Sequence, residues 1–250
     1  MNYYVTSDPH GHYYALRFAL TEKGFFDDSE DHKLMILGDV MDRGEQPVEM
    51  QKFLLELMDE GRLILIRGNH EDLFVDLATK DRGLAMEHHV HNGTFQTALD
   101  LTGFSVLDAM TYPEDFSVAM RGTTFYRTII PSALPYYETE QYIFTHGYLP
   151  CRSGQRGTFV YRPDWRESEE YEWRGARWIN GMLAAQTAKA EKTVVVGHWH
   201  TSYGHSKLEH NGPEFGQGAV FTPYYGDGII ALDACTVQTG MVNVIVIEDA

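Results

Sequence analysis

The sequence predicts an α/β fold in which strands alternate with helices. In the first third of the chain, short apolar runs alternate with segments whose apolar residues have helical spacing, which gives the order β-α-β-α-β-α. Each of the three strands ends in a glycine-containing turn that also carries Asp, His or Asn. A chain of 250 residues, 43% of them hydrophobic, can bury a substantial core. We therefore predict a single domain over residues 1–250.

The first three strands are expected at residues 2–6, 33–37 and 63–67. The first is rich in aromatic and β-branched residues, and the third is almost continuously apolar, as expected of a strand covered on both faces. Residues 13–21 have the apolar pattern of a helix. A second helix is expected over residues 47–58, because it begins with a proline and continues with an apolar stripe.

The later part of the chain is predicted to complete the same domain. Residues 78–134 read as mostly helical with Gly, Pro and Asp breaks, and we expect a cap or insertion there. Two further strands are expected at residues 141–145 and 193–196, where apolar runs again end in His-Gly or Gly-His. The last two strands, residues 228–233 and 241–247, are expected to pair as an antiparallel hairpin.

Residues 152–174 are polar, aromatic and rich in both charges, and they are predicted to form a surface excursion over the site, followed by a helix over residues 174–188. We expect the three tryptophans of this region to pack the excursion rather than to stack on a nucleobase. They are Trp165, Trp173 and Trp178.

The composition excludes several classes of partner and location. With 36 acidic and 20 basic residues, the chain has a net charge of −16 and no basic run, so long nucleic acid is a poor partner. The apolar runs are too short to span a membrane, and no signal peptide is evident. Two cysteines, Cys151 and Cys235, do not make a disulfide framework. We expect a cytoplasmic protein; the oligomeric state stays open.

Seven polar side chains of metal-ligand type follow the predicted strands. They are Asp8, His10, Asp39, Asn69, His146, His198 and His200. Carboxylates, imidazoles and one amide oxygen suit Mn²⁺, Fe or Zn²⁺ better than Ca²⁺ or Mg²⁺, and we expect Mn²⁺. Seven ligands are too many for one ion, but they suit two divalent ions that share a bridging group. Asp39 is the expected bridge because it ends the middle strand of the early β-α-β-α-β unit.

The residues next to these candidate ligands suggest phosphoryl chemistry. Asp39, Asp42 and Arg43 lie within five residues of one another. Two carboxylates this close repel each other unless a cation or Arg43 neutralises them, so the stretch is either a solvated turn with an ion pair or a functional site. Two ions about 3.5–4 Å apart can activate a hydroxide and hold both oxygens of a displacement at phosphorus. Arg43 would grip the phosphoryl oxygens in a planar fork. His70 would assist the leaving alcohol, and Asp42 would orient it.

Five short blocks carry a family resemblance. They are DPHG at 8–11, GDVMDRG at 38–44, GNHE at 68–71, HG at 146–147 and GH at 197–198. In order and spacing the chain resembles the calcineurin-like metallophosphoesterases. The intact second and third blocks resemble the serine/threonine phosphoprotein phosphatases most, especially the compact bacterial and bacteriophage lambda type.

The resemblance implies a two-sheet β-sandwich flanked by helices, with two metals at the sheet edge. It implies a first metal on Asp8, His10 and Asp39, and a second on Asp39 and three further ligands. These are Asn69, His146 and His198. The implied activity is hydrolysis of phosphoserine or phosphothreonine in proteins by direct attack of a hydroxide that bridges the metals. Arg43 would bind phosphate, and the Asp42–His70 pair would assist the leaving group.

Two positions remain open beside the resemblance. The GHxH ending at His200 is more typical of nucleases and phosphodiesterases in the wider superfamily, where the last histidine binds the first metal; the alternative is an outer contact. The family also uses a second phosphate-binding arginine, for which Arg174 and Arg177 both qualify and Arg177 is favoured.

Two rival functions follow. His200 and the short chain also suit a hydrolase of small phosphorylated molecules, such as dinucleoside polyphosphates or cyclic nucleotides. A catalytically dead scaffold is the other alternative, but such a protein should have lost ligands, and this sequence fills every ligand position.

Overall fold

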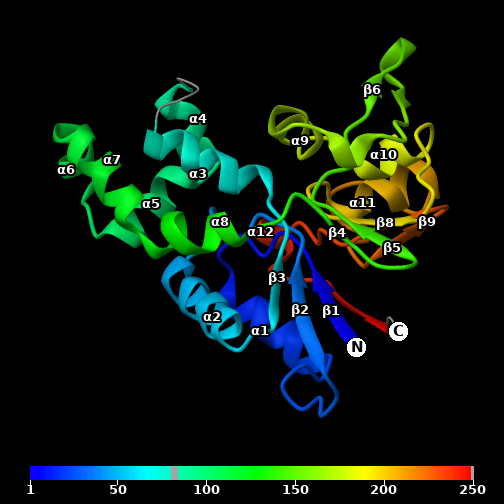
Figure 1. The fold of residues 1–250 in the computed structure, drawn as a ribbon, viewed down its shortest axis with the longest axis horizontal. Helices are drawn as coiled ribbons and strands as arrows, with labels where there is room; N and C mark the ends of the chain where they lie inside the picture. The colour runs from blue at the N-terminus through cyan, green and yellow to red at the C-terminus, as the bar shows by residue number, and fades with distance from the viewer. Residues whose placement is uncertain (80–83, 249–250) are drawn as a thin grey trace.

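Two mixed β-sheets form the centre of the computed structural model, which describes residues 1–79 and 84–248 (Figure 1). The first sheet has the strand order β11-β1-β2-β3, and the second has the order β4-β5-β8-β10-β9. The strands of the first sheet are β1 (Asn2–Thr6), β2 (His32–Ile36), β3 (Leu63–Leu65) and β11 (Val244–Glu248). Those of the second are β4 (Tyr137–Glu138), β5 (Tyr142–Phe144), β8 (Thr193–Val196), β9 (Tyr224–Gly226) and β10 (Ile229–Ala231).

Each sheet has three parallel strands, and its other strands are antiparallel to them. In the first sheet, β1, β2 and β3 are parallel, and β11 pairs antiparallel with β1. In the second, β5, β8 and β10 are parallel, and β4 and β9 are antiparallel edge strands. The carboxyl ends of parallel strands lie at one edge of a sheet, which is where α/β proteins bind ligands.

The two sheets pack face to face through apolar side chains. Alternate residues of a strand point to opposite faces, so Val5 points toward the second sheet while Tyr4 points toward the helices. Val5 and Phe144 are fully buried members of the same cluster between the sheets. This arrangement is the two-sheet sandwich that the family resemblance implied.

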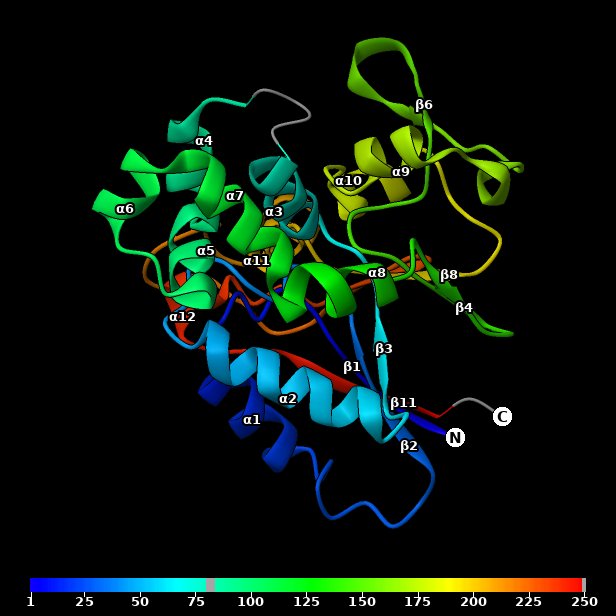
Figure 2. The ribbon, with the colours of Figure 1, turned by 60° about the vertical axis from the view of Figure 1, so that its left-hand side comes forward.

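Helices cover the outer face of the first sheet. The helices α1 (Tyr13–Glu22) and α2 (Pro47–Asp59) lie along this sheet (Figures 1 and 2), and Leu16, Leu20 and Leu54 pack against Tyr4 and neighbouring strand residues. The outer face of the second sheet is covered by α9 (Glu170–Ala176) and α10 (Gly181–Ala185). A two-stranded ribbon of β6 (Arg152–Ser153) and β7 (Phe159–Val160) projects beyond them (Figure 2).

The insertion predicted over residues 78–134 is helical in the part that the structure describes; residues 80–83 lie outside it. α3 (Asn69–Thr79) runs into this region, and its cluster of helices lies to one side of the sheets (Figure 1). The helices are α4 (Met86–His91), α5 (Thr94–Thr102), α6 (Val106–Thr111), α7 (Pro113–Gly122), the π-helix η1 (Phe125–Ile129) and α8 (Ile130–Ser132).

Short helical segments complete the described chain. They are η2 (Gln155–Gly157), η3 (Trp165–Glu167), α11 (Thr201–Tyr203), the π-helix η4 (Gly204–Leu208) and α12 (Thr236–Thr239). None of the helices in the described residues is long and apolar enough to cross a bilayer.

Two predictions of secondary structure were wrong. The last two strands do not form a hairpin, because β10 joins the second sheet beside β8, and β11 joins the first sheet beside β1. The helix expected over residues 174–188 is broken, and Asn180 caps the N-terminus of α10 by accepting a hydrogen bond from the Leu183 N–H (3.1 Å). This cap begins a new helix in the middle of the expected one.

The contact between the sheets gives a stability prediction. Phe144→Ala should lower the free energy of unfolding by about 3–5 kcal/mol, because it leaves a cavity among the buried side chains between the sheets. Val246→Ala is the control, since Val246 is 41% exposed on β11. Chemical denaturation followed by circular dichroism measures both; equal losses for the two variants would contradict this view of the inter-sheet core.

Candidate metal centre

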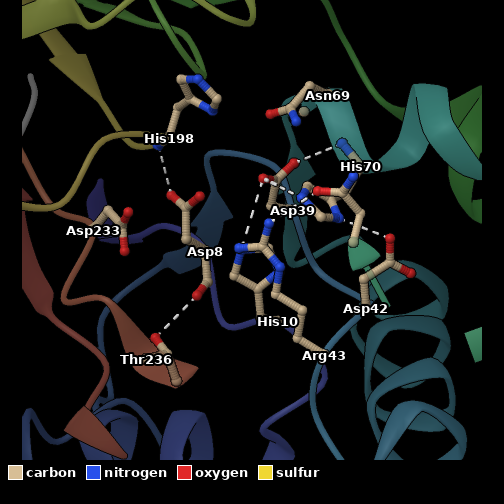
Figure 3. Close-up of polar contacts among 12 residues, drawn as sticks. Asp8, His10, Asp39, Asp42, Arg43, Asn69, His70, His198, Asp233 and Thr236 are labelled. Carbon is tan, nitrogen blue, oxygen red and sulfur yellow. Dashed lines mark hydrogen bonds and ion pairs between the residues drawn. The ribbon is translucent and has the colours of Figure 1, made fainter. Parts of the chain in front are cut away.

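Polar residues follow all six of the parallel strands, close to their carboxyl ends. In the first sheet, the residues after β1, β2 and β3 include Asp8, Asp39 and Asn69; in the second, those after β5, β8 and β10 include His146, His198 and Asp233. The close-up in Figure 3 shows Asp8, Asp39, Asn69, His198 and Asp233 around one space. Both sheets therefore contribute to a single site.

The backbone at the site is held in an unusual conformation. Among the described residues, eight other than glycine have positive φ, and seven of them belong to this region: Asp8 (51°), His10 (45°), Asp39 (53°), Asp42 (69°), Arg43 (66°), His198 (62°) and Cys235 (53°). The left-handed region is unfavourable for such residues, and strain of this kind concentrates at functional sites. Folding therefore places these side chains against local backbone preference.

Glycines and one buried glutamate fix the carboxylates. A Cβ atom at Gly197 would lie 2.2 Å from Asp8 Oδ2, and one at Gly68 would lie 2.2 Å from Asp39 Oδ1, so only glycine lets the backbone approach these oxygens. The buried Glu71 accepts the backbone N–H groups of Gly68 (2.7 Å), Asp39 (3.0 Å) and Val40 (3.0 Å). This glutamate ties the turn after β2 to the turn after β3.

Asp39 lies at the meeting point of two groups of possible ligands. Its Oδ2 lies 3.8 Å from His10 Nε2 and 3.9 Å from His70 Nε2, and its Oδ1 lies 3.4 Å from His146 Nε2. One group consists of His10, Asp39 and His70, and the other of Asp39, His146 and His198, with the ligand atoms of each within 4.8 Å of one another. The central place of Asp39 is the one expected of a bridging carboxylate.

Backbone carbonyls orient two of the imidazoles toward the space between these residues. His146 Nδ1 donates to the Leu37 carbonyl (2.6 Å), and His10 Nδ1 donates to the Met41 carbonyl (3.1 Å). The Nε2 atom of His146 then faces Asn69 Oδ1 at 2.8 Å. Such second contacts fix the tautomer that offers Nε2 to a metal.

The charges of the site match a cation. Burial lowers the pKa of His10 well below its ordinary value and that of His198 to about 3, so both imidazoles are neutral at pH 7. Burial would also lower the pKa of His146, but the attraction of Asp39 outweighs it and raises that pKa to about 10. Burial, followed by repulsion from Asp233, raises the pKa of Asp8 well above its ordinary value. The oxygen and nitrogen lone pairs of these side chains thus point into one space, where protons or divalent cations must balance the charge of the carboxylates.

A second arrangement beside this centre is suited to proton transfer. His70 Nδ1 lies 2.7 Å from Asp42 Oδ2, and both residues are buried. Two residues of the helical insertion hold Asp42: Thr94 Oγ1 donates to its Oδ2 (2.7 Å), and its own N–H donates to Thr97 Oγ1 (3.0 Å). The imidazole is therefore fixed with Nε2 facing Asp39 and the cleft (Figure 3).

A cleft of about 480 Å³ opens onto the centre. Its walls include His10, Asp39, Arg43, Asn69, His70, His91, Trp178, His198, Asp233 and residues 235–238. Arg43 is exposed, and the insertion steadies its guanidinium through a hydrogen bond from Nη2 to Asn92 Oδ1 (3.2 Å). An exposed arginine beside a cluster of cation ligands can bind an oxyanion.

Comparison with known proteins agrees with this geometry. The sequence model described as calcineurin-like phosphoesterase matches residues 1–231. The chain belongs to this family. As a member, it is a hydrolase that acts on phosphoester bonds, and the fold is the one that the family resemblance implied.

Individual known proteins match this phosphoesterase either over a small part of the chain or at low sequence identity. Two symmetrical bis(5′-nucleosyl)-tetraphosphatases of Buchnera aphidicola subsp. Acyrthosiphon pisum, from strains Tuc7 and 5A, are 41% and 39% identical to it over 71 residues. Those alignments cover 28% of this chain and only 24% of each relative. The crystal structure of a cold-active protein-tyrosine phosphatase from a psychrophilic Shewanella species superposes with a TM-score of 0.55 at 16% identity, over 99% of this chain and 75% of that one. This last likeness concerns the fold alone.

Two predicted site residues of the phosphoesterase contact carboxylate side chains in the structure. His200, like Asp8, belongs to neither group of possible ligands, and its Nε2 lies 3.0 Å from Glu214 Oε1. Arg177 is 2% exposed and does not line the cleft, because its Nη1 forms ion pairs with Asp72 and Glu170, both at 2.8 Å. Arg174, the alternative, pairs with Asp76 (2.8 Å). Both arginines, one in α9 and one at its C-cap, thus pair with carboxylates in this structure.

Other residues of the phosphoesterase site were missed or misread. Trp165 and Trp173 are buried as expected, but the packing role expected for Trp178 was wrong, because it is 42% exposed in the cleft. Asp233 was missed because it is the last residue of the strand predicted over residues 228–233, whereas the chosen ligands follow their predicted strands. Thr94 and Thr97 carry no local sequence signal, since their role depends on how the insertion folds back.

The buried position of Arg177 gives a prediction that separates structure from catalysis. Arg177→Ala should lower the free energy of unfolding by about 1–3 kcal/mol, because the buried Asp72 loses one of its partners and keeps Arg67 (2.8 Å). At a temperature where the variant is folded, its KM for para-nitrophenyl phosphate should stay near the wild-type value. Lys189→Ala, which removes an exposed ion pair with Asp227, is the control and should barely change stability. A large rise in KM without loss of stability would instead make Arg177 a phosphate ligand.

Proposed function

We propose that this phosphoesterase hydrolyses phosphate monoesters with two divalent metal ions, by direct attack of water on phosphorus. The observation that carries the proposal is the central position of Asp39 between two groups of candidate ligands, next to the Asp42–His70 pair. A covalent intermediate on the protein is not needed, since the cleft supplies charge, orientation and a proton donor.

The ions would be held by residues from both sheets. Asp8, His10 and Asp39 would hold one ion. Asp39 and three further residues would hold the other: Asn69, His146 and His198. When bound, two such ions lower the pKa of water and neutralise charge on the phosphoryl oxygens. Mn²⁺ is the proposed ion, and the mixture of carboxylates and imidazoles also suits Fe or Zn²⁺.

The remaining steps fall to side chains in the cleft. Arg43 would bind the phosphoryl oxygens in a bidentate manner, because its guanidinium is exposed there and steadied by Asn92. His70 Nε2 would carry the proton that the leaving alkoxide takes up. Asp42 would stabilise the charged imidazole through the 2.7 Å contact with Nδ1.

The proposed role of His70 at the leaving group predicts different effects of one substitution on two substrates. His70→Ala should lower kcat about 10²–10⁴-fold on an alkyl phosphate such as a phosphoserine peptide. The loss should be much smaller on para-nitrophenyl phosphate, because para-nitrophenolate leaves without being protonated. Steady-state kinetics of metal-stripped protein reconstituted with Mn²⁺ measures both substrates, and metal analysis should find both ions retained.

Two further variants complete this experiment. Asp39→Asn should abolish turnover and weaken metal retention, since it removes the bridging charge. His210→Ala, on an exposed loop, should behave as wild type. Equal losses of His70→Ala on the two substrates would rule out proton donation by His70, and full activity of Asp39→Asn would rule out the two-metal site.

The substrate has two candidate classes. Phosphoserine and phosphothreonine in proteins are the first, which the intact GDVMDRG and GNHE blocks favour by resemblance. Small nucleotides are the second, and a specific feature of the cleft favours them. Trp178 is exposed there, with its ring packed edge-on against that of His198 (centroids 5.7 Å apart). An indole beside the reaction centre offers a surface on which a nucleobase can stack. The similarity to the Buchnera tetraphosphatases supports the same class.

Trp178→Ala tests the second class. Stacking of a base on an aromatic side chain contributes about 1–3 kcal/mol, so kcat/KM for diadenosine tetraphosphate and 5′-AMP should fall about 5–150-fold. The value for glycerol 2-phosphate should change little, because that substrate has no ring. Tyr171→Ala is the matched control, since Tyr171 is 74% exposed on α9 outside the cleft. Equal losses on nucleotide and glycerol phosphate would argue against a base-stacking role and favour the phosphoprotein class.

A further inference from the structure

Asp233 occupies the last of six equivalent positions in the fold. The other five polar residues that follow the parallel strands are the metal ligands proposed above: Asp8, Asp39, Asn69, His146 and His198. Asp233 comes two residues after β10, and β10 is hydrogen-bonded to β8 in parallel register. The topology therefore brings its carboxylate to the same edge of the sandwich as the others.

The side chain lies inside the cleft rather than on the surface. Asp233 is 8% exposed, and it lines the same cleft as His10 and Asp39. Figure 3 shows its carboxylate beside that of Asp8, away from the Asp42–His70 pair. Its Oδ1 accepts the N–H of Cys235 (2.7 Å). Among the side chains that the structure describes, no lysine, arginine or histidine forms an ion pair with it within 4.0 Å.

The histidine expected at this place is engaged elsewhere. His200 Nε2 lies 3.0 Å from Glu214 Oε1, and Lys207 Nζ lies 3.0 Å from the other oxygen of Glu214. The His200 side chain is thus paired with Glu214 on the loop that follows β8, although the backbone of this loop lies beside Asp233, whose carbonyl accepts the Thr201 N–H (2.8 Å). Asp233 remains as the metal-ligand side chain next to Asp8.

Two buried carboxylates side by side repel each other strongly unless a cation lies between them. The backbone N–H groups that reach them, from His198 to Asp8 (2.9 Å) and from Cys235 to Asp233, supply only partial positive charge. A divalent cation would offset the remaining charge, and both carboxylates would have free lone pairs to bind it.

We propose that Asp233 is a ligand of the divalent ion that Asp8, His10 and Asp39 hold. This inference rests on the two-metal function proposed above and makes its two ion positions unequal. The first position has three carboxylates and one imidazole, whereas the second has one shared carboxylate, one amide and two imidazoles. Oxygen-rich sites favour Mn²⁺ and Mg²⁺, and sites with more imidazole favour Zn²⁺ and Fe. The first position is therefore selective for an oxygen-preferring ion.

Metal binding tests the assignment without any measurement of activity. Metal-stripped wild type, Asp233→Asn, His200→Gln and the exposed control Asp227→Asn are titrated with Mn²⁺ by calorimetry, and bound metal is counted after dialysis. Wild type, His200→Gln and Asp227→Asn should bind two ions per chain. Asp233→Asn should lose affinity for one ion by more than about 100-fold, beyond the 10–100-fold typical of groups that only orient ligands. The Mn²⁺ electron paramagnetic resonance spectrum should change from that of a coupled pair to that of a single ion.

A second variant tests whether the side chain at position 233 contacts the ion directly, and the measurement requires only that the variant folds. Asp233→Cys loaded with Co²⁺ should show thiolate-to-cobalt charge-transfer absorption beyond the wild-type background. Two ions bound by Asp233→Asn with wild-type affinity, or no such absorption in Asp233→Cys, would overturn the assignment while leaving the two-metal function intact. Fewer than two ions in wild type would overturn both, and loss of an ion in His200→Gln would transfer the role to His200.

Discussion

The convergence of two parallel strand triplets at one edge is the constraint on which the rest of this phosphoesterase depends. Each sheet alone brings only part of the candidate ligands to its edge. Face-to-face packing through residues such as Val5 and Phe144 sets the distance between the triplets, and so sets the distance between the carboxylates of one sheet and the imidazoles of the other. The polar centre therefore requires both sheets, and it lies at the edge of the apolar core between them.

The backbone of this centre is strained, and shared hydrogen bonds hold it in place. Positive φ at Asp8, Asp39 and His198 is unfavourable in isolation and persists because the surrounding structure fixes it. Glu71 contributes much of this support, since one side chain accepts three N–H groups from two turns. The unfavourable local conformations thus lie at the positions where function needs fixed side chains.

The sequence predicts the site better than it predicts the topology. Strand ends with glycine and a polar residue are local patterns, so positions such as Asp39 and His146 could be identified before their surroundings were known. Pairing of the final strands depends on contacts distant in sequence, because β11 adds to β1 at the start of the chain, and the hairpin prediction failed for that reason. Arg177 could not be assigned because its environment depends on Asp72, which a sequence pattern does not place beside it.

The insertion has a separate chemical task from the sheets. The sheets supply every proposed metal ligand, whereas Asn92, Thr94 and Thr97 contact Arg43 and Asp42, for which we propose roles at the phosphate and the leaving group. On these proposed roles, substitutions in the insertion would change the preference for the leaving alcohol of the substrate without affecting the ion ligands. The proposed ion ligands and the side chains that would contact the leaving group thus lie on different segments, so that a change in one helical segment could alter substrate choice while the ion ligands stay in place.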